Sequence, residues 1–307
     1  MKRFLTLVLV LCCISAIDMD ARKKAKHVVM IGVDGMSAKA VREAPAADYP
    51  NIHFLMDNGS WTLSKRAVMP SASAINWASM FNGLPTEMHG FDKWNSTHGT
   101  ITSTADNGHG IPPTIYTIIR EQIPSAETGL VCDWKGVGAV SDTLAMSFYK
   151  YIGTHKGKEI TLPPVEYTKQ IALPYLKEKK PLFFTIYFDL LDNAGHNYGW
   201  SSPEYMDTMK QMDDCIGVVI DALKEAGIFE DTVVVLSSDH GGKGKGHGKF
   251  TLEELEVPFA VYGKKIKAGH EFSVHLMQYD TPAIIADLLG VQIPADWRGR
   301  AYKEIYK

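Results

Sequence analysis

The chain has 307 residues, a formal net charge of −3 at pH 7 and a mean hydropathy of −0.10, and 45% of its residues are apolar. This composition predicts a globular protein with a substantial core and excludes intrinsically disordered and fibrous classes. A net charge this small gives no field for holding a polyanion, so a nucleic-acid polymer is not an expected partner, whereas a small anionic substrate needs only local cations.

Residues 1–16 have the three-part form of a secretory signal peptide. Two basic residues precede an apolar stretch over 4–14, and small residues follow at 15 and 16. That stretch is too short to cross a bilayer, so it predicts export to a periplasm or the medium and no transmembrane segment. Cys12 and Cys13 leave lipoprotein anchoring open as an alternative.

The first apolar run beyond this segment, from His27 to Met36, predicts a buried strand that delivers Asp34 at its carboxyl end. Helical patterns follow at about 37–43 and 51–57. An aspartate in a strand-ending turn most often accepts hydrogen bonds from its own backbone. Asp34 is therefore a candidate functional residue only if other polar side chains lie at the same sheet edge.

A serine-containing helix start comes next, in PSASAINWASMFNG. Pro70 ends an extended piece, Ser71 and Ser73 lie at the start of the predicted helix, and Asn82-Gly83 stops it. A serine in this place is usually a helix cap. The alternative is a nucleophile, because the backbone donors and positive dipole end of the helix favour an alkoxide and a bound phosphoryl group.

Residues 92–164 have a looser pattern that predicts a possible cap or insert region within one catalytic domain over 25–307. A helix near 114–122 and a strand at 129–132 are expected inside it. Cys132 and Cys215 are the cysteines beyond the predicted signal. We expect both in the core, and their separation in sequence leaves open whether they pair.

Regular patterns return in the second half of the chain. A helix over about 165–177, which Pro174 can kink, precedes a strand over 183–188. The expected turn after that strand contains Asp192 and His196, whose short spacing across a glycine would let them converge on one point. A long amphipathic helix over about 203–226 then leads into the next strand.

The stretch VVVLSSDHGGKGKGHGKF, from Val233 to Phe250, combines a strand with a cluster of metal-ligand residue types. Asp239 and His240 follow the apolar run directly, and His247 follows in a glycine-rich loop. In open α/β sheets ligands bind at the carboxyl edge of the strands. Carboxylate beside imidazole is a ligand set that first-row metals, zinc above all, prefer. A strand over 258–262 and a helix over 281–289 complete the pattern.

Polar side chains therefore leave several elements at one predicted edge of a largely parallel sheet with helices on both faces. Three aspartates and three histidines suit two divalent metal ions, most simply zinc, with three protein ligands each, and the Ser73 oxygen could complete one of them. Each residue alone has a structural explanation, but their joint occurrence at one edge favours a site. The residues are Asp34, Ser73, Asp192, His196, Asp239, His240 and His247.

The motifs VVMIGVDGM, PSASAINWASMFNGLPTEMHGF, DNAGHNYG, SSDHGGKGKGHG and IADLLGVQIPADWRGRAY, in this order, resemble the alkaline phosphatase superfamily. The resemblance is closest to its type I phosphodiesterase/nucleotide pyrophosphatase branch and covers nearly the whole chain beyond the signal. It implies an alkaline-phosphatase-like fold and a hydrolase that acts on a nucleotide or other phosphodiester through a phosphoserine-type intermediate.

The same resemblance implies roles for individual residues. One zinc would be held by Asp192, His196 and His247, a second by the residues Asp34, Asp239 and His240, and Ser73 would be the nucleophile beside the second zinc. Two positions depart from the family pattern. Serine replaces the more usual threonine nucleophile, and where the family has an asparagine that contacts a phosphoryl oxygen, this chain has Trp94 with Asn95 as its neighbour.

Three other functions stay open from the sequence. A phosphomonoesterase or a sulfatase of the same superfamily would have a similar motif order. A sulfatase needs a Cys/Ser-x-Pro-x-Arg context for formylglycine, and neither Ser71 nor Ser73 has that proline and arginine. A non-catalytic metal-containing binding protein would be expected to have lost ligands, and all six metal-ligand positions are filled.

Overall fold

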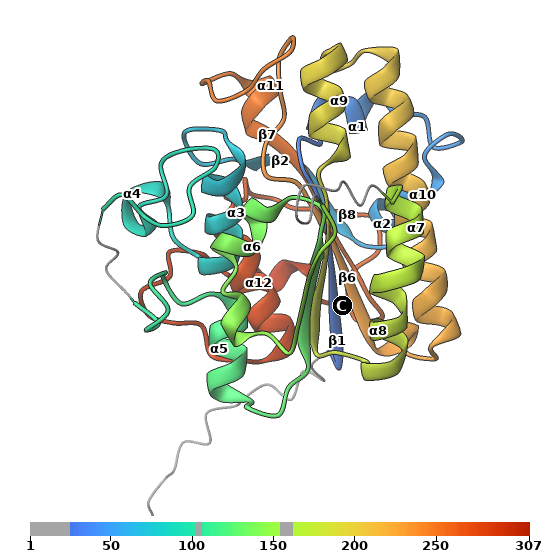
Figure 1. Ribbon diagram of the computed structural model, residues 1–307. Coiled ribbons are helices and arrows are strands. Elements are labelled where there is room, and N and C mark those ends of the chain that lie inside the picture. The colour runs from blue at the N-terminus through green and yellow to red at the C-terminus, as the bar shows by residue number, and fades with distance from the viewer. Residues whose placement is uncertain (1–24, 102–105, 154–161) are drawn as a thin grey trace, which may run out of the picture.

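The computed structural model describes residues 25–101, 106–153 and 162–307 of the chain. Its centre is an eight-stranded sheet in the order β4-β3-β5-β1-β6-β7-β2-β8 (Figure 1). β7 is antiparallel to its neighbours β6 and β2, and the pairings of the other strands are parallel. The predicted largely parallel α/β sheet is therefore confirmed, with one reversed strand. The predicted signal peptide, 1–16, lies outside the described residues.

The strands agree with the sequence prediction wherever an apolar run marks them. They are β1 (His27–Val33), β2 (Ser60–Arg66), β3 (Thr128–Cys132), β4 (Phe148–Tyr151), β5 (Phe183–Phe188), β6 (Thr232–Ser237), β7 (Glu256–Tyr262) and β8 (His270–Glu271). β2, β4 and β8 were not predicted, and in β2 the sequence SWTLSKR mixes polar residues with apolar ones and even buries Lys65.

Helices cover both faces of the sheet (Figure 1). The larger helices are α1 (Ala38–Glu43), α2 (Pro50–Asp57), α3 (Ser73–Asn82), α5 (Ile115–Gln122), α6 (Lys135–Val140), α8 (Leu173–Lys179), α9 (Leu190–Tyr198), α10 (Pro203–Glu225) and α12 (Asp280–Leu289). Short helices α4 (Thr86–His89), α7 (Pro164–Tyr167) and α11 (Leu252–Leu255) lie between them. None of the helices in the described ranges is long and apolar enough to cross a membrane.

Alternating side chains of the strands pack into two separate hydrophobic cores, one on each face of the sheet. In β1, Val28 and Met30 pack with residues of α3, α5 and α12. Val29 and Ile31 point to the opposite face and pack with residues of α1, α2 and α10. This period of two on strands buried on both faces is why the sequence shows continuous apolar runs there.

The register of the three central strands brings their carboxyl ends together. Val33 of β1 pairs with Phe188 of β5, and Gly32 pairs with Ser237 of β6. The next residues along each strand, starting at Asp34, Asp189 and Ser238, therefore leave the sheet side by side. This edge is where the polar residues singled out in the sequence gather.

Two predicted segments have a different local structure. The predicted helix over 165–177 is α7 and α8 separated by a π-helical turn at Thr168–Ala172, just before Pro174, which has no N–H to donate. The predicted turn with Asp192 and His196 is wrong, because both lie in helix α9. Its Gly195 is required for packing, since a Cβ there would lie 2.6 Å from the ring of Trp200.

The region 92–164 does not stand apart from the sheet as a whole. Its later part supplies β3 and the edge strand β4, so the described irregular residues that could shape a substrate site narrow to 92–101 and 106–113. Cys132 and Cys215 are buried and unpaired, as expected of core residues.

Candidate functional site

Ser73 is the first residue of α3, at the carboxyl edge of the sheet. The helix has Ala72 as its N-cap, and no side chain caps it, so the prediction of Ser73 as a mere cap is not what the structure shows. Ser73 is 7% exposed, and its Oγ lies 3.2 Å from Nε2 of His240. Ser71 is fully buried and donates from its Oγ to the carbonyl of Lys249 at 3.0 Å, which gives it a structural role in the loop.

All three predicted histidine ligands have the same orientation. The Nδ1 of each faces a backbone carbonyl: His196 that of Lys245 at 3.1 Å, His240 that of Gly241 at 2.9 Å, and His247 that of Ser71 at 2.8 Å. A carbonyl only accepts, so Nδ1 carries the proton and the lone pair of Nε2 is turned into the site. This is the tautomer that a metal ligand needs.

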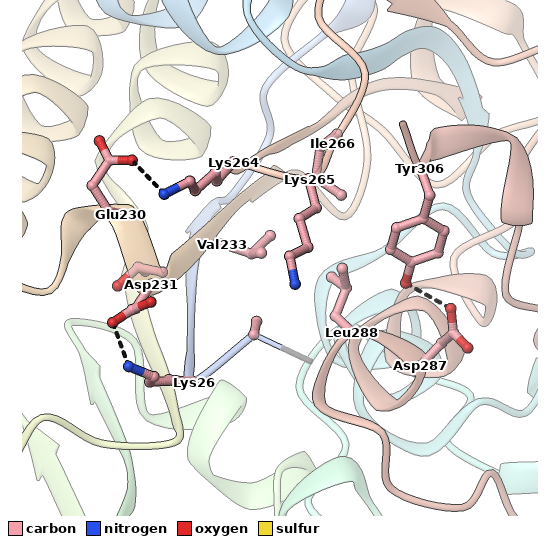
Figure 2. Close-up of a pocket in the computed structure, with 12 residues that line it drawn as sticks. Lys26, Glu230, Asp231, Val233, Lys264, Lys265, Ile266, Asp287, Leu288 and Tyr306 are labelled. Carbon is pink, nitrogen blue, oxygen red and sulfur yellow. Dashed lines mark hydrogen bonds and ion pairs between the residues drawn. The ribbon is translucent and has the colours of Figure 1, made fainter. Parts of the chain in front are cut away.

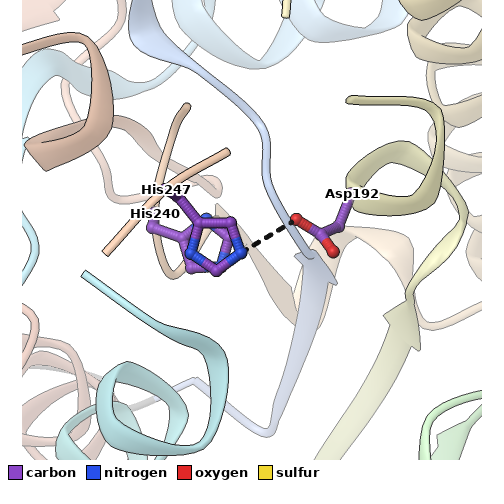
Figure 3. Close-up of side chains that lie close together, drawn as sticks. All are labelled: Asp192, His240 and His247. Carbon is purple, nitrogen blue, oxygen red and sulfur yellow. Dashed lines mark ion pairs between the residues drawn. The ribbon is translucent and has the colours of Figure 1, made fainter. Parts of the chain in front are cut away.

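Asp192, His196 and His247 form one group of converging side chains. His196 Nε2 lies 3.1 Å from His247 Nε2 and 3.4 Å from Asp192 Oδ2, and His247 Nε2 lies 3.7 Å from Asp192 Oδ1. Figure 3 shows Asp192 opposite the rings of His247 and His240, which stack with their centroids 3.7 Å apart. The i, i+4 spacing on α9 puts Asp192 and His196 on one face of that helix.

Asp34, Asp239 and His240 form a second, fully buried group. His240 Nε2 lies 3.1 Å from Asp239 Oδ2 and 3.5 Å from Asp34 Oδ1. These three residues offer ligand atoms within 4.8 Å of one another, as do Asp192, His240 and His247. The structure thus brings all seven predicted residues, Ser73 included, into two adjoining groups.

Burial and mutual repulsion strongly perturb these groups. Burial, together with the neighbouring carboxylates of Asp34 and Asp189, raises the pKa of Asp192 to about 9, and burial raises that of Asp239 well above its usual value. Burial raises the pKa of Asp34 to about 6 against the opposing hydrogen bonds it accepts. Burial lowers the pKa values of His240 and His247 to about 3. Such perturbed groups are typical of functional sites.

Several carboxylate oxygens at this edge lack a hydrogen-bond donor. They are Asp34 Oδ1, Asp192 Oδ1 and Asp239 Oδ2, all buried. No lysine or arginine of the described chain pairs with these three aspartates. Unpaired carboxylates next to imidazole lone pairs are costly unless a cation lies between them, so the residues fit divalent metal ions.

Two side chains that the sequence did not single out for this role hold Asp34 in place. The indole of Trp77 donates to Asp34 Oδ2 at 2.9 Å, and the hydroxyl of Tyr187 donates to the same oxygen at 2.5 Å. Both come from elements next to the site, α3 and β5. Only the position of Trp77, four residues after Ser73 on a helix, hinted at this from sequence.

A cavity of about 700 Å³ opens beside Ser73 and the first group of ligands. Trp94, 58% exposed, lines it, and its backbone carbonyl accepts from the N–H of Ala74 at 3.0 Å. Asn95 is exposed and is not among the lining residues. Asp92, Trp134, Asp189 and Asn193 also line the cavity and were missed, although Asp189 follows β5 directly and the strand-end rule could have found it.

The remaining residues near the motifs have structural roles. Trp77 and Trp200 are buried and pack in the two cores. Lys243 pairs with Glu253, and Lys245 donates to the carbonyl of Asn197. These contacts give the two loop lysines structural roles at the surface.

The sequence of this chain is similar to those of phosphodiesterases. The family model described as type I phosphodiesterase / nucleotide pyrophosphatase matches residues 28–256. A venom phosphodiesterase from Crotalus durissus collilineatus is 27% identical over 267 residues, which cover 83% of this chain and 29% of that protein. This chain therefore spans less than a third of that relative.

Solved structures with the same fold include both phosphodiesterases and sulfatases. Murine ectonucleotide pyrophosphatase/phosphodiesterase 5 in complex with AMP is 14% identical, with a TM-score of 0.71, covering 92% of this chain and 100% of that one. A 2-O GAG sulfatase is 17% identical, with a TM-score of 0.69, covering 91% of this chain and 73% of the other. At these identities the likeness shows the fold alone.

Proposed function

This chain belongs to the type I phosphodiesterase/nucleotide pyrophosphatase family, and from that membership and the site geometry we propose that it is a two-metal phosphoric-ester hydrolase of the phosphodiesterase type. The proposal includes one zinc ion between Asp192, His196 and His247 and a second between the side chains of Asp34, Asp239 and His240. Residues 25–307 would form its single catalytic domain.

The observation that carries the proposal is the common orientation of the three imidazoles. Each Nδ1 is fixed by a backbone carbonyl. The Nε2 atoms of His240 and His247 face the donor-free oxygens Asp239 Oδ2 and Asp192 Oδ1, and that of His196 lies 3.4 Å from Asp192 Oδ2. A purely structural cluster would pair these carboxylates with N–H or O–H donors. Lone pairs from imidazole and carboxylate that face one another are instead what a cation site requires.

The proposed reaction begins at Ser73. Its hydroxyl lies at the amino end of α3, where the helix dipole favours developing negative charge, and its oxygen would attack phosphorus to form a phosphoserine. The ester oxygen leaves as the alcohol, and water then cleaves the phosphoserine. Two divalent ions, when bound, would neutralise the phosphoryl oxygens and stabilise charge on the attacking and leaving oxygens.

The substrate we propose is a small anionic ester, a nucleotide or another phosphodiester, bound in the cavity beside Ser73. Its size of about 700 Å³ suits a small molecule rather than a polymer. Residues 92–113 are the proposed substrate-shaping segment, through Asp92 and Trp94. We do not propose Asn95 as a phosphoryl contact, because its side chain is exposed outside the cavity.

Export of the protein remains part of the proposal, supported by the venom and ectonucleotide phosphodiesterase relatives.

Hydrolysis of a phosphomonoester or of a sulfate ester is the second candidate, and the sulfatase among the similar folds favours testing it. The sequence around Ser73 lacks the proline and arginine expected for formylglycine formation, so phosphate chemistry ranks first. A metal-containing binding protein without catalysis is the third candidate.

One experiment separates these candidates. Release of p-nitrophenol from bis-p-nitrophenyl phosphate, p-nitrophenyl phosphate and p-nitrophenyl sulfate is measured with zinc and with a chelator. We expect zinc-dependent turnover that is fastest with the diester. Turnover of the sulfate alone would establish the sulfatase, and metal binding without turnover of any ester would favour the binding protein.

A further inference from the structure

The main chain that leaves β6 carries two residues of the second group of predicted ligands. Asp239 and His240 come shortly after Ser237, the last residue of the strand, so the carbonyls of Ser238 and Asp239 lie beyond the sheet pairings on both sides. Ser238 and Asp239 are fully buried. Buried carbonyls need hydrogen-bond donors, which must come here from outside the sheet.

Gln278 supplies a donor for both carbonyls. Its side-chain Nε2 donates to the carbonyl of Ser238 at 3.0 Å and to that of Asp239 at 2.5 Å. A carbonyl only accepts, so the nitrogen of the amide and not its oxygen must face the turn. Gln278 is fully buried, lies just before α12 and is 39 positions away from Asp239 in the sequence.

The other end of the same amide is left without a partner. Gln278 Oε1 is buried and has no hydrogen-bond donor in the described structure. An unpaired buried acceptor is costly, and an apolar side chain of the same size would avoid that cost. Packing of the core therefore does not account for a glutamine here, whereas the two hydrogen bonds from its nitrogen do.

The segment that carries Gln278 is fixed on both sides. Asp280, the first residue of α12, accepts from the N–H of Met277 at 2.7 Å. At the other end of α12, the hydroxyl of Tyr306 donates to Asp287 at 2.7 Å, beside a cavity of about 370 Å³ at the amino ends of β1 and β6 (Figure 2). A side chain on so firmly held a segment can fix the position of the turn that it contacts.

We propose that Gln278 is a positioning residue for the metal ion of the group Asp34, Asp239 and His240, and that its amide sets the affinity of this group for a divalent ion. The inference rests on the proposed function, which supplies the metal site. The peptide groups of Ser238 and Asp239 determine where the Asp239 carboxylate points. Holding them keeps Asp239 Oδ2 opposite His240 Nε2, at 3.1 Å.

A zinc titration tests this role without relying on turnover. Wild-type protein and Gln278→Met are stripped of metal and titrated with zinc by calorimetry. Methionine fills the same space but offers no donor. We expect one of the two ions to bind roughly 10–100-fold more weakly, the usual effect of losing a group that orients a ligand, and the other ion to bind as in the wild type. Unchanged binding of both ions, or an equal loss at both, would overturn the proposal.

Double variants identify the ion that is affected. Gln278→Met should add little to Asp239→Asn, because both changes act on the second group. Combined with Asp192→Asn, which damages the first group, it should still weaken zinc binding by roughly 10–100-fold. The opposite pattern would assign the effect to the first group and contradict the proposal.

Two control variants exclude a general loss of stability. Thr281→Val changes a buried side chain of the same helix whose Oγ1 has no hydrogen-bond partner in the part of the chain described. Tyr306→Phe removes the bond to Asp287 at the far end of α12. Both should keep the zinc affinities within about twofold. A loss in either that equals that of Gln278→Met would trace the effect to α12 as a whole and refute the positioning role.

Hydrogen exchange of the wild-type protein tests the same coupling without any variant. Linkage is reciprocal, so zinc must stabilise the contact that favours zinc binding. Zinc should therefore slow exchange of the N–H groups of Gln278 and Thr281, which donate to the carbonyls of Arg66 and Gln278, more than exchange of the N–H of Lys267, which donates to Ile305. Equal slowing at all three positions would contradict the coupling.

Zinc binding and turnover together separate this inference from the proposed function. If the wild type binds two zinc ions and hydrolyses bis-p-nitrophenyl phosphate while Gln278→Met keeps both affinities, only the positioning role is refuted. If zinc is bound but no ester is hydrolysed, the proposed hydrolase fails, and the zinc affinities alone decide the role of Gln278. If the wild type binds no zinc, both are refuted.

Discussion

Ser73 and His240 are separated by 167 positions in the sequence, yet the Ser73 hydroxyl oxygen lies 3.2 Å from the His240 ring nitrogen Nε2. The first belongs to the amino end of α3 and the second follows β6 directly. His240 also lies against Asp34 and Asp239, so the hydroxyl touches the second group of predicted ligands. The proposed attacking oxygen is thus in direct contact with one of the proposed metal ligands.

Replacing Ser73 by alanine should reduce diester turnover by at least about a thousandfold, because no other group would accept the phosphoryl. Metal content and the far-UV circular dichroism spectrum should stay unchanged, since the Ser73 side chain caps nothing. Ser71→Ala is the matched control. It removes a hydroxyl that donates to Lys249 and accepts from the N–H of Gly248, and should cost about 1–3 kcal/mol of stability while most activity remains. Full activity of the Ser73 variant would refute its role.

Metal-free protein should lose stability as the pH rises from about 6.5 to 9. The folded-state pKa of Asp192 is raised to about 9, so its contribution to stability is present at low pH and lost as the pH rises through that value. Asp239 acts in the same direction. The lowered pKa values of His240 and His247 make their contribution complete above about 6.5, the unperturbed histidine value.

In this pH window Asp192 and Asp239 each contribute a falling slope of up to about 1.4 kcal/mol per pH unit, and Lys65, whose pKa burial lowers, contributes a slope of the opposite sign, so the predicted loss of stability is the net of these effects. Zinc binds the ionised carboxylates, so zinc-loaded protein should lose less stability over this pH range than metal-free protein. The Tm difference between zinc-loaded and chelator-treated samples should therefore widen with pH. Thermal melts at pH 6.5, 7.5 and 8.5 check this. A chelator-treated sample whose Tm rises over this range would contradict the pKa assignments.

Trp94 and Asn95 should respond differently to substitution. Trp94→Ala removes an indole that lines the cavity but keeps the backbone carbonyl that accepts from Ala74, so KM should rise several-fold with a smaller change in kcat. Asn95→Ala, at an exposed neighbouring position outside the cavity, should leave both constants within about twofold, since surface substitutions perturb little. A larger effect at Asn95 than at Trp94 would return the phosphoryl contact to Asn95.

Lys65→Met should stabilise the protein at pH 7. The Lys65 ammonium is fully buried and donates to Ser237 Oγ at 2.7 Å, and burial lowers its pKa well below the usual value. Because the lysine pKa is lowered in the folded state, the unfolded state takes up a proton that the folded state resists. Stability is therefore lost as the pH falls below the pKa of the unfolded-state lysine. Methionine fills the same space without that cost, and we expect a gain on the order of 1 kcal/mol.

Chemical denaturation at pH 7 and pH 9.5 measures this effect, and the gain should be smaller at pH 9.5. Lys39→Met is the control, because Lys39 pairs with Glu43 on the surface and should change stability by less than about 0.5 kcal/mol. A loss of stability in the Lys65 variant would show that the bond to Ser237 outweighs the cost of burial.

Local patterns predicted the parts of the fold that depend on local sequence. β1, β5 and β6 are apolar runs because both of their faces are buried, and the same strands deliver Asp34 and the Asp239-His240 pair at one edge. β2 was missed because its burial depends on β7 and β8, which lie far away in the sequence. The turn predicted around Gly195 was wrong because that glycine fits the ring of Trp200, a contact that spacing does not reveal.

Some features of the candidate site could likewise be predicted from local sequence, and others depend on packing between distant segments. Metal-ligand residue types at strand ends could be read directly, because parallel strands share one edge. The roles of Trp77 and Tyr187, in contrast, depend on how α3 and β5 pack beside Asp34. Such relationships arise from packing, which sequence spacing does not encode.

The most direct test of the two-metal site is a crystal structure of zinc-loaded protein with anomalous diffraction recorded at the zinc edge. We predict two anomalous peaks, one within bonding distance, about 2.0–2.2 Å, of Asp192, His196 and His247, and the other at that distance from Asp34, Asp239 and His240. A protein that binds no transition metal, or peaks away from these side chains, would contradict the account.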